Sequence, residues 1–496
     1  MITFIAALLL LAAGYIVYGR IVEHIFRPDA SRPTPAQRLA DGVDYMVMST
    51  WKVFLIQFLN IAGTGPIFGA IMGILFGPSA YLWIVGGCIF MGAVHDYFTG
   101  MISLRKDGAT IPEIVGDEMG YAARILMRIF SLVLLILVGA VFVCTPADLL
   151  ATLCGGEGAG VIFDHWRLIW ICIIFAYYVL ATLLPIDVLI GRLYPLFGAA
   201  LLIMAVGVGV GIFVEEGWLP ELTDAPFLTH HPGGKSIFPY LFITIACGAL
   251  SGFHATQSPL MARCLTSEHR GRFVFYGAMI TEGVVALIWA AAAIKFASTY
   301  GQPDGVILTG ADAYANLQGM GTPAVIVSFI CSTWMGRIGA VLAVIGVAAA
   351  PITSGDTALR SARLIFADFL HMPQDNIWRR LLLALPVFAG CLGLLFINFD
   401  SLWRYFGWTN QTLAALTLWT VSMWLLRRGR CYWVTFLPAC IMTCVCTTYI
   451  LTSPAEGFGI SLCSSTLTGL ALTLVLALLF LRAAHHWRRS GKIIED

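Results

Sequence analysis

The sequence predicts an all-α polytopic membrane protein with about 13 membrane-spanning helices. Three observations support this fold class. Of the 496 residues, 59% are hydrophobic and only 11% are charged, against about 25% charged in ordinary soluble domains. Apolar stretches of about 20 residues, the length that crosses a bilayer, recur along the whole chain. Basic residues also collect in alternate loops between these stretches, as they do when every second loop faces the cytoplasm.

The composition also limits partners and cofactors. A net charge of +1 provides no basic field for nucleic acid, so we exclude nucleic-acid partners. The 13 cysteines contain no Cys-x-x-Cys pair and lie mostly in apolar stretches, where small residues pack helices together. We therefore expect no cofactor besides a coupling ion, and we expect the lipid bilayer and a small-molecule substrate as partners. The sequence leaves the oligomeric state open.

Each candidate span is an apolar stretch long enough, or nearly long enough, to cross about 30 Å as a helix. The boundaries of these spans are uncertain by about 2–4 residues. In chain order they are 2–19, 53–76, 80–103, 129–148, 167–184, 195–215, 237–262, 274–298, 339–364, 381–398, 404–426, 432–452 and 460–482.

The distribution of basic residues predicts the orientation. With the N-terminus outside, most of the 29 Lys and Arg residues fall in loops on one side of the membrane, which the positive-inside rule assigns to the cytoplasm. The C-terminus is then cytoplasmic. The few basic residues on the opposite side are Arg167, Lys235, Lys295, Arg337 and Arg404.

One apolar segment does not fit as a full span. Residues 323–335 are too few to cross the membrane before Gly336 and Arg337, and counting them as a span would move the basic loop at 360–380 outside. We interpret them as part of a re-entrant or cap segment, residues 304–337, in an external loop.

The second candidate span is broken near its middle. Residues 60–66 read Asn-Ile-Ala-Gly-Thr-Gly-Pro, and Pro66 removes an amide and clashes with the carbonyl four residues earlier. The seventh span has a similar region from Gly248 to Pro259, with two glycines, a proline and five polar side chains. Backbone freed at membrane depth is tolerated where it is buried in protein or lines a cavity. The alternative is an ordinary Pro/Gly kink in a helix bundle.

The two broken spans are five spans apart and run in opposite directions. This spacing predicts two inverted repeats of five helices, spans 2–6 and 7–11, each opening on a discontinuous helix. The chain then divides into four parts. These are an additional N-terminal helix (1–19), the first repeat (45–215), the second repeat with the external cap (236–428), and two C-terminal helices with a basic tail (430–496).

Such a break predicts a secondary transporter with its substrate site at the break. A half-helix that starts near Gly65 presents unpaired N–H groups and a positive dipole end, which favour an anionic group such as a carboxylate. Gly63, Thr64 and Gly65 are the expected carboxylate ligands. The expected opposite wall and a contribution from span 11 are Ser251, Gly252, His254 and Gln257, and Asn410 and Gln411.

A few ionisable residues lie inside candidate spans, where desolvation is costly and a functional role is the default hypothesis. His95, Asp96, Glu282 and Asp356 are candidates for proton coupling, and so is His254, because histidine titrates near neutral pH. Asp356 also fits an i,i+4 pair with Arg360 on one helix face. Glu282 also fits a buried structural hydrogen bond.

Several blocks of the sequence resemble the carbon starvation protein A (CstA) family of peptide and pyruvate transporters. The blocks are spread over most of the chain, which makes chance similarity improbable. They are 60–67 (Asn-Ile-Ala-Gly-Thr-Gly-Pro-Ile), 92–97 (Gly-Ala-Val-His-Asp-Tyr), 109–114 (Ala-Thr-Ile-Pro-Glu-Ile), 251–257 (Ser-Gly-Phe-His-Ala-Thr-Gln), 355–363 (Gly-Asp-Thr-Ala-Leu-Arg-Ser-Ala-Arg) and 406–411 (Phe-Gly-Trp-Thr-Asn-Gln).

The resemblance implies a LeuT-like five-plus-five core in a bacterial inner (plasma) membrane protein. It also implies a candidate sodium site, formed by carbonyls at the first break together with a carbonyl and two hydroxyls on span 9. The positions of this sequence that match are Leu59, Ala62, Ala350, Thr353 and Ser354. Serine and threonine also serve as simple contacts between helices, and many proteins of this fold use protons instead.

The sequence and the resemblance together predict import of a small carboxylate-bearing nutrient by proton or sodium symport, without covalent chemistry. The resemblance leaves pyruvate and short peptides equally open. Two alternatives come from other classes: an intramembrane aspartyl protease that uses Asp96 and Asp356, and an ion channel, which permits flux without accumulation.

Overall fold

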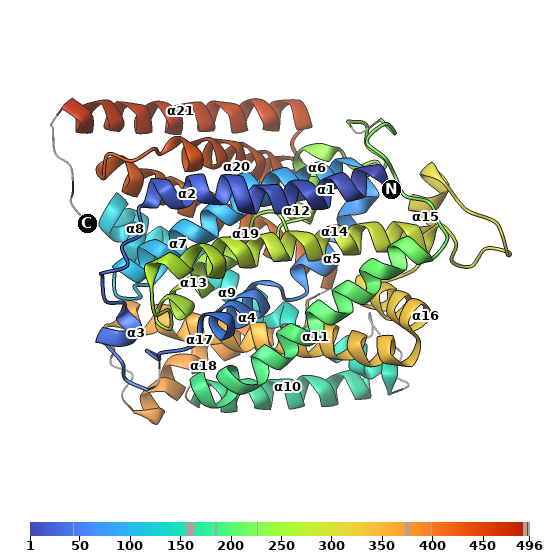
Figure 1. Cartoon of the computed structure of the whole chain (residues 1–496), viewed down its shortest axis with the longest axis horizontal. Coiled ribbons are helices and arrows are strands. Elements are labelled where there is room, and N and C mark those ends of the chain that lie inside the picture. The colour runs from blue at the N-terminus through green and yellow to red at the C-terminus, as the bar shows by residue number, and fades with distance from the viewer. Residues whose placement is uncertain are drawn as a thin grey trace.

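The computed structural model describes residues 1–42, 44–154, 164–183, 186–225, 227–372, 376–397, 399–489 and 494. Within these residues the regular secondary structure is entirely helical. Most of the long helices lie roughly along one axis of the bundle, and the two chain ends lie at opposite ends of this axis (Figure 1). The predicted topology requires such a separation of the termini, although the orientation itself stays a prediction.

The first half of the chain begins with one continuous helix and continues with a broken one. Its elements are α1 (Ile2–Ala13), η1 (Gly14–Tyr18), α2 (Gly19–Phe26), α3 (Pro35–Arg38), α4 (Thr50–Ile61), α5 (Gly65–Gly73), η2 (Ile74–Phe76), α6 (Ser79–Gly87), η3 (Cys88–Gly92), α7 (Ala93–Arg105), α8 (Ile111–Met119), α9 (Tyr121–Leu153), α10 (His165–Leu183) and α11 (Ile186–Val214).

The second half begins with the second broken helix, α12 and α13. Its elements are α12 (Ile237–Thr244), α13 (Gly252–Ala262), η4 (Glu268–Arg270), η5 (Arg272–Tyr276), α14 (Gly277–Ala297), α15 (Gly310–Gly319), α16 (Pro323–Val344), η6 (Ile345–Ala349), α17 (Ala350–Leu370), α18 (Ile377–Leu394), α19 (Phe399–Arg427), α20 (Trp433–Thr452) and α21 (Leu462–Arg489).

Among the described residues, 9 helices are long and apolar enough to cross a membrane, and 10 if the bent pair α4 and α5 counts as one span. The polytopic membrane fold is therefore confirmed, whereas the count of about 13 stays a prediction. One of the 9 is α16, Pro323–Val344, although residues 323–335 were not predicted to form a full span. The predicted spans outside this set coincide with helices that are shorter, more polar or broken: α10, α12 with α13, α17 and α19.

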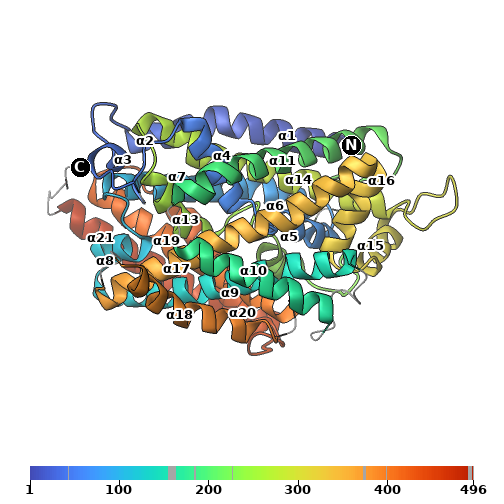
Figure 2. The ribbon, with the colours of Figure 1, turned by 90° about the horizontal axis from the view of Figure 1, so that it is seen from below.

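Burial distinguishes the centre of the bundle from its edge. In the span that contains α14, 89% of the apolar segment is buried, whereas in α21 only 17% is buried. The α1–α2 helix and α6 pack against α14, and α21 packs on α20 at the edge of the bundle (Figure 1). Helices α11 and α16 lie side by side on another face (Figure 2). The core thus surrounds α14 and the two broken helices.

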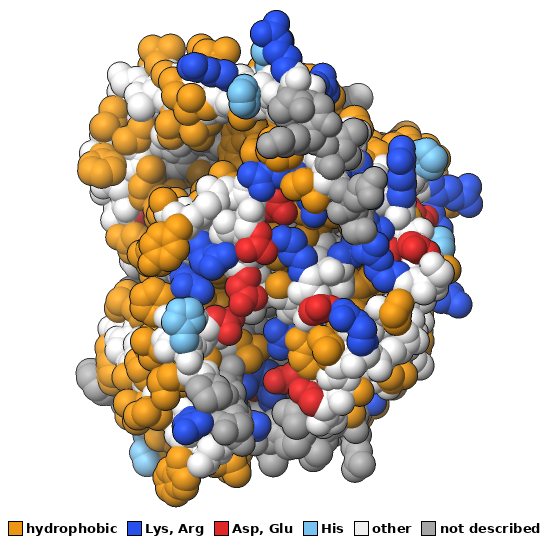
Figure 3. Space-filling view, turned by 90° about the vertical axis from the view of Figure 1, so that its left-hand side faces the viewer, with side chains coloured by type: hydrophobic (Ala, Val, Ile, Leu, Met, Phe, Trp, Pro, Cys, Tyr) orange, Lys and Arg blue, Asp and Glu red, His pale blue; other side chains and the backbone are white. Residues whose placement is uncertain are grey.

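The end of the bundle that carries the C-terminus is rich in charge. Lys, Arg, Asp and Glu side chains gather there, flanked by hydrophobic side chains (Figure 3). Helices α3 and α8 lie at this end, and the region around α15 lies at the opposite end with the N-terminus (Figures 1 and 2). The gathered charge agrees with the end predicted to face the cytoplasm.

Glycine explains the break in the predicted cap segment. The backbone of α16 leaves the helical region at Gly336, with φ 61° and ψ −143°, a conformation that L side chains rarely adopt. The helix is therefore two pieces, one of which ends before Gly336 while the other continues through η6 into α17. Whether residues 304–337 form an external cap stays a prediction.

Candidate functional site

The two helix breaks predicted from the sequence are present, and they face each other. α4 ends at Ile61 and α5 begins at Gly65, with a bend of 47° between them. α12 ends at Thr244 and α13 begins at Gly252. A Cβ on Gly65 would lie 2.5 Å from Cys247, and a Cβ on Gly69 would lie 2.9 Å from the Thr244 carbonyl oxygen. Only glycine permits this approach, so the small residues bring the two broken helices together.

The second break is shorter than the predicted segment. It covers the residues between Thr244 and Gly252, and Pro259 lies inside α13 rather than at a break. Hydroxyls beside this proline serve the local backbone: Ser258 donates to the His254 carbonyl at 3.0 Å and Thr256 donates to the Phe253 carbonyl at 2.6 Å. The break therefore overlaps only the first part of the predicted segment, Gly248 to Pro259, and α13 continues through the proline.

The first break is lined by polar side chains that are completely buried. Thr64 is 0% exposed, and so are Gln57 and Asn60 on the last turns of α4. The side-chain polar atoms of these three residues have no hydrogen-bond partner among the residues that the structure describes. A Cβ on Gly63 would lie 3.2 Å from the Ser354 hydroxyl. Buried polar groups without partners are costly, so this region is suited to a polar ligand.

Gln57 and Asn60 were not among the predicted ligands. Their signal in the sequence was the spacing of polar side chains three and four residues apart, Gln57, Asn60 and Thr64, on one face of an otherwise apolar helix. The face became recognisable only when the structure showed that these residues are buried at the break.

The structure gives Asn410 a structural role at the start of α13. Its Oδ1 accepts from the Phe253 amide at 2.7 Å and from the Ser251 hydroxyl at 3.1 Å. Its Nδ2 donates to the Ser251 hydroxyl oxygen at 3.0 Å. A Cβ on Gly252 would lie 2.4 Å from the Asn410 carbonyl oxygen. Asn410 therefore caps the helix from α19, as a side-chain oxygen does at an N-terminus.

The other predicted wall residues bind protein groups along α13 and α12. Gln257 donates through Nε2 to the Thr256 hydroxyl at 2.9 Å and to the Ser361 hydroxyl at 3.4 Å. Gln411 donates to the Phe242 carbonyl at 2.8 Å. Their assignment as substrate ligands stays a prediction.

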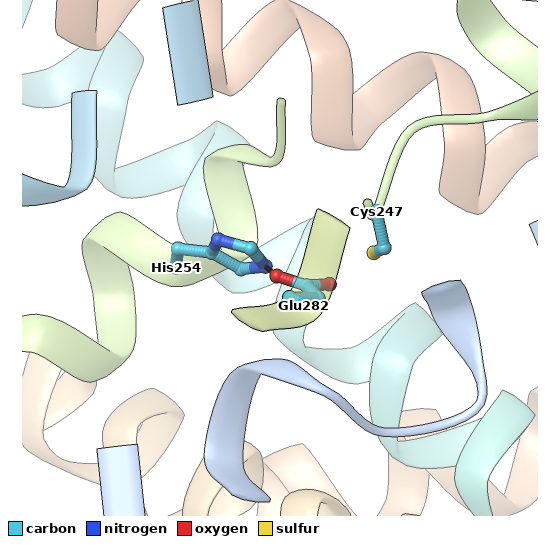
Figure 4. Close-up of side chains that lie close together, drawn as sticks. All are labelled: Cys247, His254 and Glu282. Carbon is cyan, nitrogen blue, oxygen red and sulfur yellow. Dashed lines mark ion pairs between the residues drawn. The ribbon is translucent and has the colours of Figure 1, made fainter. Parts of the chain in front are cut away.

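Four ionisable side chains form one buried chain. Asp96 accepts at both carboxylate oxygens, from His95 Nδ1 and from His254 Nδ1, each at 2.8 Å. His254 Nε2 lies 3.4 Å from a Glu282 carboxylate oxygen, and Figure 4 shows the ring pointing at that carboxylate. All four side chains are 0% exposed. They come from α7, α13 and α14, elements that the sequence could not place side by side.

Cys247, His254 and Glu282 also bring a thiol, an imidazole and a carboxylate together (Figure 4), with ligand atoms within 4.8 Å of one another. Among the described residues this is the group that could hold a metal ion. The Asn410 amide, however, points a donor at the Cys247 sulfur at 3.8 Å, and the thiol lies 3.6 Å from the Ser251 hydroxyl. A donor aimed at the sulfur fits a thiol in a hydrogen-bond network, and we assign no metal here.

The residues that match a sodium site are partly assembled. The Ser354 hydroxyl lies 3.0 Å from the Leu59 carbonyl oxygen at the end of α4. The Thr353 hydroxyl lies 2.7 Å from the Ala350 carbonyl oxygen on α17. Ala62 follows the last residue of α4 and is fully buried. The oxygens are those a small hard cation prefers, and a bound sodium ion stays a prediction.

Asp356 lies elsewhere, on α17, and is 1% exposed. A Cβ on its neighbour Gly355 would contact the Tyr178 hydroxyl. Arg360 donates to the Ala181 carbonyl at 2.8 Å. This backbone hydrogen bond offsets part of the free-energy cost of burying the Arg360 guanidinium. Both roles considered for Asp356, in proton coupling and in a pair with Arg360, stay predictions.

A cavity of about 950 Å³ reaches Thr244, where the second break begins. Its lining includes Ile71 on α5, Thr244 at the end of α12, and Trp403 on α19. Its polar rim includes Lys235 and Glu456, which the predicted topology places outside. The volume is within the range of pockets for small organic ligands.

With this geometry in view, the comparisons with known proteins decide the family. The profile described as carbon starvation protein CstA matches residues 1–162, 156–320 and 307–449. The chain belongs to the CstA family. A protein of Haemophilus influenzae called an uncharacterized membrane protein is 48% identical over 338 residues, covering 60% of this chain and 91% of its own.

Two family members from Escherichia coli have named activities. The peptide transporter CstA is 25% identical over 563 residues, covering 89% of this chain and 80% of its own length. The pyruvate/proton symporter BtsT is 26% identical over 568 residues, covering 87% of this chain and 78% of its own length. The resemblance found in the sequence is thereby confirmed, and the chain is grouped with secondary active transporters.

Solved structures confirm the fold. MhsT in complex with L-phenylalanine has a TM-score of 0.56 at 13% identity, covering 87% of this chain and 98% of its own. The Eremococcus coleocola manganese transporter has a TM-score of 0.56 at 11% identity, covering 90% and 97%. At these identities the likeness shows the LeuT-type fold alone. The assignment of the two five-helix repeats stays a prediction.

Proposed function

We propose that this CstA-family transporter imports a small carboxylate-bearing nutrient, pyruvate or a short peptide, by symport with a proton or a sodium ion. The observation that carries the proposal is the pair of helix starts, Gly65 and Gly252, at two breaks that face each other. Helix N-termini at such breaks present N–H groups and a positive dipole end to an anion. The substrate carboxylate binds at Gly63, Thr64 and Gly65.

Relatives support the substrate class. The names of the two Escherichia coli proteins, a peptide transporter and a pyruvate/proton symporter, specify substrates that share a carboxylate. The cavity near the breaks, about 950 Å³, is large enough for either. Each candidate coupling ion has a candidate site: the oxygens around Leu59 and Ser354 suit sodium, and the buried side chains around Asp96 suit a proton.

The alternatives explain less. An aspartyl protease needs its two carboxylates to share a proton, but both oxygens of Asp96 already accept from imidazoles. A channel does not require two breaks that face each other, and it predicts equilibration without accumulation.

Uptake into proteoliposomes tests the proposal. Purified protein is reconstituted, and radiolabelled pyruvate and glycylglycine are offered under an imposed sodium gradient or an imposed pH gradient. We expect at least one probe to accumulate above its external concentration under at least one gradient. Equilibration without accumulation under both gradients identifies a channel, and no flux of either probe contradicts the substrate class.

A matched pair of variants tests the carboxylate site. Thr64→Val removes a buried hydroxyl at the break, and Thr468→Val removes an exposed one on α21. A hydrogen bond to a charged group contributes about 1.5–3 kcal/mol, so we expect Thr64→Val to raise the KM for the transported probe about 10-fold or more. The control variant should leave KM within twofold. An unchanged KM in Thr64→Val contradicts carboxylate binding at this break.

A further inference from the structure

The buried chain of His95, Asp96, His254 and Glu282 is more than a packing contact. Its two carboxylates and two imidazoles are all 0% exposed, and burying charge is costly unless it is paired. A structural contact between three helices could be made with neutral side chains at lower cost. Imidazoles in contact with carboxylates are, by contrast, suited to take up and release protons near neutral pH.

We propose that this four-residue chain is the proton-binding site of the transport cycle, with His254 as the residue that links the proton to helix movement. The proposal rests on the proposed function, which it deepens by selecting the coupling ion and its residues. The sequence alone had left His254 between the substrate wall and proton coupling. The structure places its ring between two carboxylates.

The position of His254 explains the link. His95 and Asp96 are neighbours on α7 within the continuous helix Ser79–Arg105, and Glu282 lies on the continuous α14. His254 is the member on a broken helix, in the first turn of α13. Any tilt of α13 changes the contacts of His254 to Asp96 and Glu282 while the His95–Asp96 bond persists. Proton occupancy and the position of α13 therefore bias each other.

The groups around His254 carry few other charges. Facing it are Asp96 from α7, Glu282 from α14 and the Cys247 thiol at the second break. His95 binds the other carboxylate oxygen of Asp96, and the Cys88 thiol donates to the Met279 carbonyl at 3.3 Å. With both carboxylates ionised and both imidazoles neutral, the four side chains carry a charge of −2, so two added protons make them neutral. A third proton makes the chain positive by one unit.

That extra charge lies next to the proposed carboxylate site. Cys247 is within 4.8 Å of the His254 and Glu282 ligand atoms, and its side chain lies 2.5 Å from where a Cβ on Gly65 would be. One side chain thus separates the two sites. A carboxylate at Gly65 and one added proton on the chain cancel each other, which lowers the cost of carrying both through a low-dielectric region. One proton should accompany each pyruvate.

Proteoliposomes that carry the full chain test the proposal with two readouts. Counterflow of radiolabelled pyruvate or glycylglycine at equal pH reports binding and exchange. Accumulation under an inward pH gradient of one unit reports proton coupling. For wild type at one proton per substrate we expect counterflow and up to about 10-fold accumulation, since one pH unit corresponds to a factor of ten.

Three variants distinguish coupling from folding. We expect His254→Gln and Glu282→Gln, purified as monodisperse protein, to keep counterflow within about threefold and to lose accumulation. His165→Gln, which removes an exposed histidine at the start of α10, should behave as wild type. With pyruvate, an inside-negative potassium diffusion potential should leave accumulation unchanged, because the loaded site is neutral.

Each other outcome contradicts a specific step. Accumulation by His254→Gln at the wild-type ratio, or accumulation that follows a sodium gradient and ignores pH, overturns the proton site while the proposed function stands. Loss of counterflow in both monodisperse variants assigns the four buried side chains to substrate binding or folding, and this result also overturns the proton site. Absence of wild-type counterflow for both probes overturns the proposed function and the proton site with it.

Discussion

Removal of the Asn410 side chain is the sharpest test of how the second break is held. Asn410 Oδ1 accepts from the Phe253 amide at 2.7 Å and from the Ser251 hydroxyl at 3.1 Å, and the side chain is fully buried. In Asn410→Ala both donors lose this acceptor without gaining water. A buried donor left without its partner costs about 1–3 kcal/mol, so for two donors we expect a loss of about 2–6 kcal/mol in the free energy of unfolding.

The assay is thermal unfolding in detergent. For a chain of 496 residues, the entropy of unfolding is on the order of 1 kcal/mol per kelvin, so the melting temperature should fall by about 2–6 °C. Asn410→Asp retains an acceptor oxygen and should recover most of the loss. The control variant is Thr468→Val on the exposed face of α21, which should leave the melting temperature unchanged.

The result that refutes this reasoning is a different split of effects. If Asn410→Ala has the melting temperature of wild type but raises the KM for the transported probe about 10-fold, the side chain binds substrate, as the sequence had predicted, and does not cap α13. A helix cap instead lowers stability in the absence of substrate.

Two further predictions concern the close approach of the breaks and the loop before α12. Gly65→Ala places a Cβ 2.5 Å from Cys247, so overpacking should cost about 1–3 kcal/mol of stability. The double variant Gly65→Ala with Cys247→Gly should recover part of the melting temperature and part of the uptake. If the double variant recovers neither, the contact between Gly65 and Cys247 is contradicted. Burial lowers the pKa of His231 to about 4, and its ring packs 4.8 Å from Phe76. Because the unfolded chain takes up the proton first, near pH 6.5, stability should fall as the pH drops from 6.5 toward 4. His231→Asn should show a smaller fall in melting temperature over that range, and an equal fall refutes the assignment.

The helix breaks could be predicted because their cause is local. Pro66 and the glycines around it interrupt a helix wherever they occur, and the structure has α5 beginning at Gly65. The limit of this reasoning is found at Pro259, which lies inside α13. A count of Pro and Gly does not distinguish a proline that ends a helix from one that a buried membrane helix accommodates.

The partners of polar side chains could not be predicted because they come from other helices. The sequence identified Asp96 and His254 as ionisable residues in spans, but the direction in which each side chain points depends on how α7 and α13 pack. The same holds for Asn410, which reaches α13 from α19. In the sequence Cys247 was one of many packing cysteines, whereas the structure places it in the second break, against Gly65 of the first.

The contacts of α13 indicate where its movement begins. Its first turn is fixed to α19 by Asn410 through neutral hydrogen bonds, whereas its contact with α7 and α14 depends on the protonation of His254. Its far end is followed by Arg263, which donates to the Gly108 carbonyl at 2.9 and 3.0 Å. Since a helix fixed at one end moves most at the other, a small change of tilt at His254 becomes largest at Arg263, and we expect protonation changes at His254 to strain the Arg263 bonds first. Arg263→Gln should therefore speed counterflow more than it changes KM, and a change confined to KM would place the pivot elsewhere.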